Sequence, residues 1–87
     1  MAYTVEILRR AEKTLRGLTD RKFYRRLRET IDALAIEPRP HGCIKLSGAK
    51  DLYRVRVGDH RIVYQVIDHR LLVLVVDIGH RRDIYRA

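Results

Sequence analysis

The first half of the chain contains one alternating segment, followed by two segments with a helical period. Residues 2–7 alternate between polar and apolar positions, which predicts a strand with one buried face. A short helix that ends near Gly17 is expected next, because apolar residues then recur every three or four positions. A second helix can be capped by the carboxylate of Asp20, and Pro38 ends it. The apolar residues are Ala11, Leu15 and Leu18 in the first helix, and Phe23, Leu27, Ile31 and Leu34 in the second.

From residue 52 onward the pattern has a period of two. Three β-rich runs, Leu52–Val57, His60–Asp68 and Leu71–Ile78, are joined by the two-residue connections Gly58-Asp59 and His69-Arg70. Glycine at the first position of a connection favours a type II′ hairpin, and the last run is apolar on both faces, as is typical of a central strand. The predicted fold is α+β: an N-terminal strand, a helical hairpin, and an antiparallel three-strand meander forming one small sheet with helices on one face.

The register of the first hairpin brings several arginines together. A two-residue turn at Gly58-Asp59 places Arg56 opposite Arg61 and puts both on the same face as Arg54. Continued through the second connection, this register carries His80 to the end of the same surface and puts Asp77 on the opposite face. That opposite face is expected to form the helix-packed core, with Tyr53, Val55, Ile62, Tyr64, Val66, Val73 and Val75.

Two arginines directly opposite each other are an unfavourable pair in a sheet. Like charges in that position destabilise a sheet by up to ~1 kcal/mol relative to a neutral pair. Such a pair is expected where an anion binds, unless an acidic residue such as Asp51 or Asp59 neutralises it. The register therefore predicts a phosphate site at Arg54, Arg56 and Arg61.

The composition agrees with an anionic partner. The chain has 87 residues with 19 Lys+Arg and 11 Asp+Glu, a formal net charge of +8, and 15 of its basic residues are arginine. A chain of this length forms one small domain and excludes a deep cleft between domains. Guanidinium groups bind phosphate bidentately, so nucleic acid is the first expected partner and an acidic protein the second. A membrane partner is not expected, because no segment combines a broad apolar face with a basic one.

Two further features bear on location and docking. Cys43 is the single cysteine, and the longest apolar run, Leu71–Val76, is too short to span a bilayer, so a soluble cytoplasmic protein without a disulfide is expected. On the polar side of the second helix lies a basic run that is typical either of a solvated face or of a surface that follows phosphates. This run includes Arg21, Lys22, Arg25 and Arg28.

The C-terminal residues add cations, an imidazole and an aromatic ring. His80, Arg81, Arg82 and Tyr85 fall within six positions of one another. A tyrosine beside guanidinium groups can stack an unpaired base, and it can equally pack the end of the sheet. Neither paired carboxylates nor the H-x3-H spacing of a metal site is present, so neither a metal nor another cofactor is expected. Cations with one or two imidazoles suit attack of an RNA 2′-hydroxyl on its own phosphodiester, which needs positive charge, a proton acceptor and a proton donor.

The chain resembles the RelE/ParE superfamily of type II toxins, on the RelE side, in the segments MAYTVEILRRAEKTLRGL, Glu37-Pro38-Arg39-Pro40 and KLSGAKDLYRVRVGDHRIVYQVIDHRLLVLVVDIGHRRDIYR. The resemblance implies a single toxin domain over residues 1–87 that enters the ribosomal A site and cuts mRNA there, leaving a 2′,3′-cyclic phosphate. It also implies inhibition by a cognate acidic RelB-like antitoxin, with operator DNA contacted only indirectly through that antitoxin.

The resemblance also implies roles for individual residues. By analogy Arg61 would stabilise the phosphorane, Arg81 would assist the leaving 5′-oxygen, Arg54 would hold a phosphate, and Tyr85 would stack or orient a base. In the family, lysines occupy the positions of Arg54 and Arg56, and one of them is proposed as the base. Arginine stays protonated, so the candidate bases here are His80 and then His60. Arg56 joins the catalytic set, and Arg82 and His60 join Arg54 in binding substrate.

Two other functions are compatible with the same sequence. A ParE-type toxin would inhibit DNA gyrase through protein contacts, and its arginines would not need to share one sheet face. A non-catalytic RNA-binding module would bind RNA through the same arginines without cutting it.

Overall fold

The computed structural model describes residues 2–48 and 50–80, and it places the predicted helices close to their expected positions. The side chain of Asp20 caps the second helix by accepting hydrogen bonds from the backbone N–H groups of Lys22 (3.0 Å) and Phe23 (3.1 Å). The first helix ends at Gly17, as expected. The elements of this half are β1 (Thr4–Ile7), α1 (Arg9–Arg16) and α2 (Arg21–Ala33).

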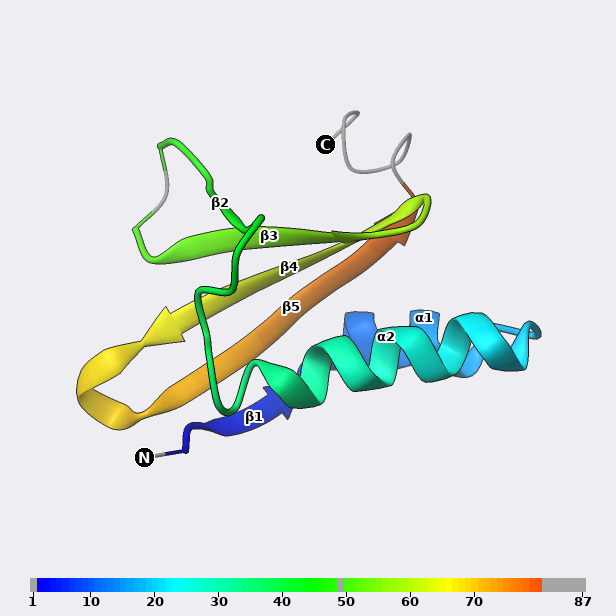
Figure 1. Cartoon of the computed structure of the whole chain (residues 1–87), viewed down its shortest axis with the longest axis horizontal. Helices are drawn as coiled ribbons and strands as arrows, with labels where there is room; N and C mark the ends of the chain where they lie inside the picture. Colours follow the sequence, from blue (N-terminus) through cyan, green and yellow to red (C-terminus); the bar gives the residue numbers. More distant parts are fainter. Residues whose placement is uncertain (1, 49, 81–87) are drawn as a thin grey trace.

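The sheet is larger than the predicted meander. Its elements after α2 are β2 (Ile44–Lys45), β3 (Leu52–Val57), β4 (His60–Ile67), the 3-10 turn η1 (Asp68–Arg70) and β5 (Leu72–His80). The described residues form one five-stranded mixed sheet in the order β1-β5-β4-β3-β2, with both helices over one face (Figure 1). Strands β3, β4 and β5 are antiparallel neighbours, whereas β1 runs parallel to β5. The α+β class is thus confirmed, and β5 lies inside the sheet as its apolar faces predicted.

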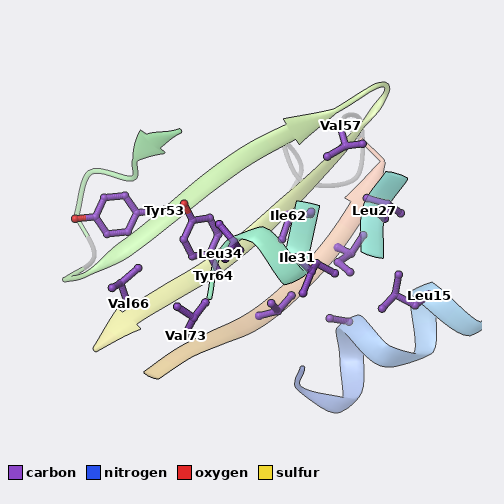
Figure 2. Packing of buried hydrophobic residues seen from close by; sticks show 13 residues of the cluster. Leu15, Leu27, Ile31, Leu34, Tyr53, Val57, Ile62, Tyr64, Val66 and Val73 are labelled. Atoms are coloured by element: carbon purple, nitrogen blue, oxygen red, sulfur yellow. The ribbon is translucent and has the colours of Figure 1, made fainter. Parts of the chain in front are cut away.

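The core fills the space between the helices and one face of the sheet (Figure 2). From the helices it takes Ala11, Leu15, Leu27, Ile31 and Leu34, all buried. Of the sheet positions predicted for the core, Val55 is half-buried and the other six are buried. No helix in the described ranges is long and apolar enough to cross a membrane.

The second hairpin departs from the predicted register because β5 contains a bulge. Ile67 still pairs with Leu72, but the register shifts between Val63 and Tyr64, and an extra residue of β5 is accommodated there. Beyond the bulge, Asp77 rather than Val76 lies opposite Val63. The connection itself is a 3-10 turn followed by Leu71 at φ 49° rather than a two-residue turn.

The bulge corrects the predicted positions of two polar residues. Asp77 lies on the same face as the arginines, and His80 pairs with His60 on the helix-packed face. The physical reason is Ile78, which pairs with Ile62 and is 1% exposed. An unbulged strand would direct the Asp77 carboxylate toward the core in its place, and a buried unpaired carboxylate is far more costly than a bulge.

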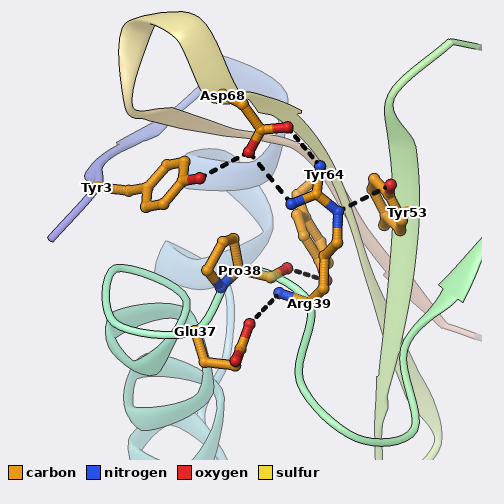
Figure 3. A network of polar contacts seen from close by, with 7 residues as sticks. All are labelled: Tyr3, Glu37, Pro38, Arg39, Tyr53, Tyr64 and Asp68. Carbon is orange, nitrogen blue, oxygen red and sulfur yellow. Dashed lines mark hydrogen bonds and ion pairs between the residues drawn. The ribbon is translucent and has the colours of Figure 1, made fainter. Parts of the chain in front are cut away.

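A polar network ties the loop after α2 to the sheet at the end far from the β3–β4 turn (Figure 3). The Arg39 guanidinium donates to both carboxylate oxygens of Asp68, at 3.2 and 2.7 Å, and its Nε donates to the Tyr53 hydroxyl at 2.9 Å. Tyr3 donates its hydroxyl to the same carboxylate at 2.6 Å. These hydrogen bonds, the one from Arg39 foremost, lower the pKa of Asp68 to about 2.

One buried hydroxyl completes this attachment. Tyr64 is fully buried, and its hydroxyl donates to the carbonyl oxygen of Pro38 at 2.8 Å. Burial raises the pKa of Tyr64 above its usual value, so the phenol stays neutral and keeps its donor. This hydrogen bond holds the loop after α2 against β4, and it gives the buried carbonyl oxygen of Pro38 a partner.

Candidate active site

The first hairpin places three arginines as predicted. Gly58 opens the turn at φ 58°, the sign that a type II′ turn requires at this position. Arg56 pairs with Arg61, and Arg54 pairs with Val63. All three arginines lie on the sheet face that the helices leave uncovered, and we call it the arginine face.

The arginines differ in their access to solvent. Arg56 is exposed and Arg54 is half-buried, while Arg61 is 0% exposed. A phosphate approaching this face therefore meets Arg56 and Arg54 directly. Arg61 is not accessible to solvent in this structure.

Within the described residues, no carboxylate forms an ion pair with Arg54 or Arg56 on the arginine face. Asp77, which the bulge brings to this face, forms an ion pair with Arg10 at 3.4 Å. None of the ion pairs within the described residues joins Arg54 or Arg56 to Asp51, to Asp59 or to any other carboxylate. The two accessible guanidinium groups are thus available to an anion, which supports the interpretation of their register as a phosphate site.

The two candidate bases lie side by side at the end of the sheet. The rings of His60 and His80 are 5.5 Å apart, and His60 also packs against Phe23 of α2 at 4.7 Å. Both imidazoles are therefore on the helix side, contrary to the predicted position of His80. His80 nevertheless follows Gly79, which is the direct partner of Arg61 in the sheet. The imidazoles and the arginine face thus lie on opposite sides of the sheet, and the imidazoles are at the end of the sheet.

Three predicted site residues cannot be placed. Arg81, Arg82 and Tyr85 lie outside the described residues, so their assignment stays a prediction.

The structure places a second guanidinium group, an imidazole and a carboxylate near Arg56 that sequence spacing did not reveal. Arg56 lines a groove of about 460 Å³ together with Arg26 and Glu29 of α2 and His41 of the following loop. These residues are distant from one another in the sequence and meet only because α2 packs across the sheet beside β3. A local pattern contains no signal for such a grouping.

Comparison with known proteins decides the family. The chain matches the ParE toxin of the type II toxin–antitoxin system, parDE, over residues 5–85. It is 35% identical over 86 residues to the mRNA interferase toxin RelE of Escherichia coli K12, covering 93% of this chain and 85% of that protein. The chain belongs to the RelE/ParE superfamily of toxins.

Solved structures of this superfamily have the same fold. RelE in the archaeal RelE–RelB complex of Pyrococcus horikoshii OT3 superposes with a TM-score of 0.82 at 36% identity, covering 93% of this chain and 97% of that one. The corresponding chain of the intact E. coli RelBE toxin–antitoxin complex gives a TM-score of 0.78 at 31% identity, with coverage of 91% and 96%. The five-stranded sheet and helical pair of this RelE/ParE toxin are thus the fold of RelE.

Proposed function

We propose that this toxin is a ribosome-dependent mRNA endonuclease that inhibits translation by cutting mRNA in the A site. The observation that carries the proposal is the arginine face, where Arg56 stands opposite Arg61 and no described carboxylate pairs with Arg54 or Arg56. Relatives named as mRNA interferases, such as E. coli RelE, support the same reaction. A chain too short for a deep cleft between domains fits a toxin that uses the ribosome as the other wall of its site.

The proposed reaction is a transfer within the RNA strand and uses no metal. The 2′-oxygen of the nucleotide before the scissile phosphate attacks phosphorus, the P–O2′ bond forms, and the P–O5′ bond breaks to leave a 2′,3′-cyclic phosphate. A base takes the proton of the 2′-hydroxyl, and an acid gives a proton to the leaving 5′-oxygen. Arg54 and Arg56 would hold the phosphate, and Arg61 would neutralise the charge that develops on the phosphorane. Arg81 remains the proposed group at the leaving oxygen, with Tyr85 and Arg82 binding the RNA.

His80 is the proposed base, with His60 as the second candidate. Imidazole titrates near neutrality, whereas an arginine in the family's lysine position stays protonated. Because both rings lie at the end of the sheet, the RNA must pass around that end to bring its 2′-hydroxyl within reach. We expect His80→Gln to lower the single-turnover cleavage rate and alter its pH dependence while ribosome binding is nearly unchanged. His69→Gln, at the opposite end of the hairpin, is the control, and an unchanged rate for His80→Gln would exclude this base.

An acidic RelB-like antitoxin is the proposed inhibitor. The arginine face combines the cations with half-buried apolar side chains that no described helix covers, among them Leu52, Val63, Leu72 and Leu74. An acidic chain with apolar residues would cover both kinds of group, and its binding would stabilise the toxin by mass action. The melting temperature should rise on adding antitoxin, and the association rate should fall with salt. An unaltered melting temperature would contradict this partner.

The direct test adds the purified toxin to ribosomes carrying a defined message. We expect new mRNA 5′ ends in register with the codon in the A site, and no cutting of the same RNA without ribosomes. Intact mRNA would contradict the proposal.

The ParE-type function is the second candidate, because the matching family model is described as the ParE toxin. A DNA gyrase supercoiling assay run beside the ribosome assay separates the two: inhibited supercoiling with intact mRNA indicates the ParE-type function. Binding of RNA without either effect would instead indicate a non-catalytic RNA-binding module.

A further inference from the structure

The ion pair between Arg10 and Asp77 lies at the border of the arginine face, and no step of the proposed reaction uses it. Strand β1 pairs with β5 only as far as Val75, so that β5 continues past the end of β1 (Figure 1). The first turn of α1 begins at that point, because the backbone N–H of Leu8 donates to the carbonyl oxygen of Val75 at 2.9 Å. Arg10 therefore reaches β5 at its open edge, and its Nε lies 3.4 Å from Oδ1 of Asp77.

Asp77 is a close neighbour of the arginines in the sheet. It pairs with Val63, which pairs in turn with Arg54, so Asp77 and Arg54 lie in one row across three strands. With strands ~4.8 Å apart, their Cα atoms are separated by ~10 Å. Arg61 pairs with Gly79 and is thus the diagonal neighbour of Asp77, at ~7–8 Å on the same face. The negative charge of Asp77, if left without a counter-charge, would compete with a bound phosphate for the cations of this face.

The exposure of the ion pair indicates that it affects the charge of the face more than the stability of the fold. The side chain of Arg10 is 78% exposed and that of Asp77 is 29% exposed. Ion pairs this open to solvent add little stability, because water already solvates both charges. The position of Asp77 is instead fixed by packing, since Ile78 fills the core and the residue before it must point to the open face. Packing thus forces a carboxylate onto an anion-binding face, and Arg10 supplies the opposing charge.

We propose that Arg10 is a positioning residue of the phosphate site, which acts by holding and neutralising the carboxylate of Asp77. The proposal rests on the proposed function, because it takes the arginine face as the site of the RNA phosphate. With Arg10 in place the pair carries no net charge, and a phosphate meets Arg54 and Arg56 without an opposing anion beside them. When Arg10 is replaced, the charge of Asp77 repels that phosphate. Arg10 acts through Asp77 and does not itself contact the phosphate.

The test measures binding of inorganic phosphate to the full-length toxin by NMR, at an ionic strength of ~0.1 M, where the Debye length of ~10 Å screens remote charges. The side-chain Nε–H signals of Arg54 and Arg56 report binding at the arginine face and separate it from binding elsewhere on the chain. The variants are Arg10→Gln, Asp77→Asn, the double variant with both changes, and Arg10→Lys. Circular dichroism and the melting temperature establish that each protein is folded.

The matched control uses a second ion pair of α1. Arg16 and Glu12 are 3.6 Å apart, and the side chain of Arg16 is also 78% exposed. Arg16 lies ~9 Å farther along the helix than Arg10, and Glu12 belongs to the same helix, which packs on the core side of the sheet. Arg16→Gln therefore removes one charge from the same helix and leaves a carboxylate without its counter-charge, but that carboxylate is not on the arginine face.

We expect Arg10→Gln to weaken phosphate binding at Arg54 and Arg56 by roughly two- to fivefold, the effect of charges ~10 Å apart at this ionic strength. Asp77→Asn should strengthen binding by a similar factor, and the double variant and Arg10→Lys should both bind phosphate as the wild type does. Arg16→Gln should have little effect. On ribosomes carrying a message, the single-turnover cleavage rate at subsaturating toxin should follow the same order.

A double variant that binds as weakly as Arg10→Gln would overturn the proposal, because Arg10 would then contact the phosphate itself. Equal losses in Arg10→Gln and Arg16→Gln would also overturn it, since they indicate attraction by net charge alone. Weaker binding by Asp77→Asn, unchanged binding by Arg10→Gln, or no phosphate binding at Arg54 and Arg56 of the wild type would each do the same.

The outcome is separable from that of the proposed function. Phosphate binding is measured without ribosomes and without a message, whereas the proposed function is tested by mRNA ends. A toxin in which Arg10 and Asp77 control phosphate binding as expected, but which leaves mRNA intact, would refute the nuclease and keep the role of Arg10.

Discussion

Replacing Arg56 with threonine is expected to stabilise the folded toxin while it weakens phosphate binding. Arg56 lies directly opposite Arg61 in the sheet, so the substitution removes one of two facing positive charges. Threonine is β-branched and suits a strand. The matched control is Arg54→Thr, on the same strand and the same face, whose partner in β4 is the uncharged Val63.

The magnitude follows from the burial of the partner charge. Like charges directly opposite in a sheet cost roughly 0.2–1 kcal/mol, and the upper end applies here because Arg61 is 0% exposed and poorly screened by water. We therefore expect Arg56→Thr to exceed Arg54→Thr in stability by about 1 kcal/mol. For a domain of this size that corresponds to a melting temperature higher by about 4–8 °C.

The assay is urea unfolding and calorimetry of the wild type and both variants at low and high salt. The difference between the variants should be largest at low salt and should shrink as salt screens the exposed charge. Added phosphate should raise the melting temperature of the wild type more than that of Arg56→Thr, because an anion bound to the native state stabilises it.

Two results would refute this reasoning. Arg56→Thr could prove no more stable than Arg54→Thr at low salt, in which case the facing arginines do not repel measurably. A stability difference that is the same in concentrated salt would have a non-electrostatic cause. Either result would remove the energetic argument that this face is arranged for an anion.

Three further substitutions test the fold that positions the site. Asp68→Asn should reduce the loss of unfolding free energy at acid pH, measured by urea unfolding at several pH values. The pKa of Asp68 is lowered from 3.8 to about 2 in the folded protein, so the stability gained from Arg39 is present above pH 3.8 and is lost as pH falls toward 2. Gly58→Ala should cost about 1–2 kcal/mol in urea unfolding, because φ is 58° there and an added Cβ would lie 3.1 Å from Cε1 of Phe23. Leu27→Ala should cost about 2.7–5 kcal/mol and lower the melting temperature sharply, since Leu27 is 0% exposed in the core.

Local sequence patterns predicted the features that depend on neighbouring residues. The cap at Asp20, the end of α1 at Gly17 and the pairing of Arg56 with Arg61 each follow from a few adjacent positions. The candidate phosphate site was predictable for the same reason, because a tight turn at Gly58 fixes which side chains share a face.

Features decided by packing across the molecule could not be predicted in this way. The bulge in β5 exists because Ile78 fills the core against Ile62, and this preference depends on the helices above the sheet. It moved His80 to the helix side. Strand β2 is too short to have a period, and the hydrogen bonds of Arg39 join residues far apart in the sequence.

The central claim is that this toxin cuts mRNA by attack of the substrate's own 2′-hydroxyl, with the arginine face holding the phosphate. The most direct measurement compares two messages on ribosomes, identical except for a 2′-deoxy nucleotide immediately before the scissile phosphate. We predict that the unmodified message is cut to a 2′,3′-cyclic phosphate, while the modified message binds the toxin equally well and stays intact. Cutting of the 2′-deoxy message at the same phosphate would contradict the account.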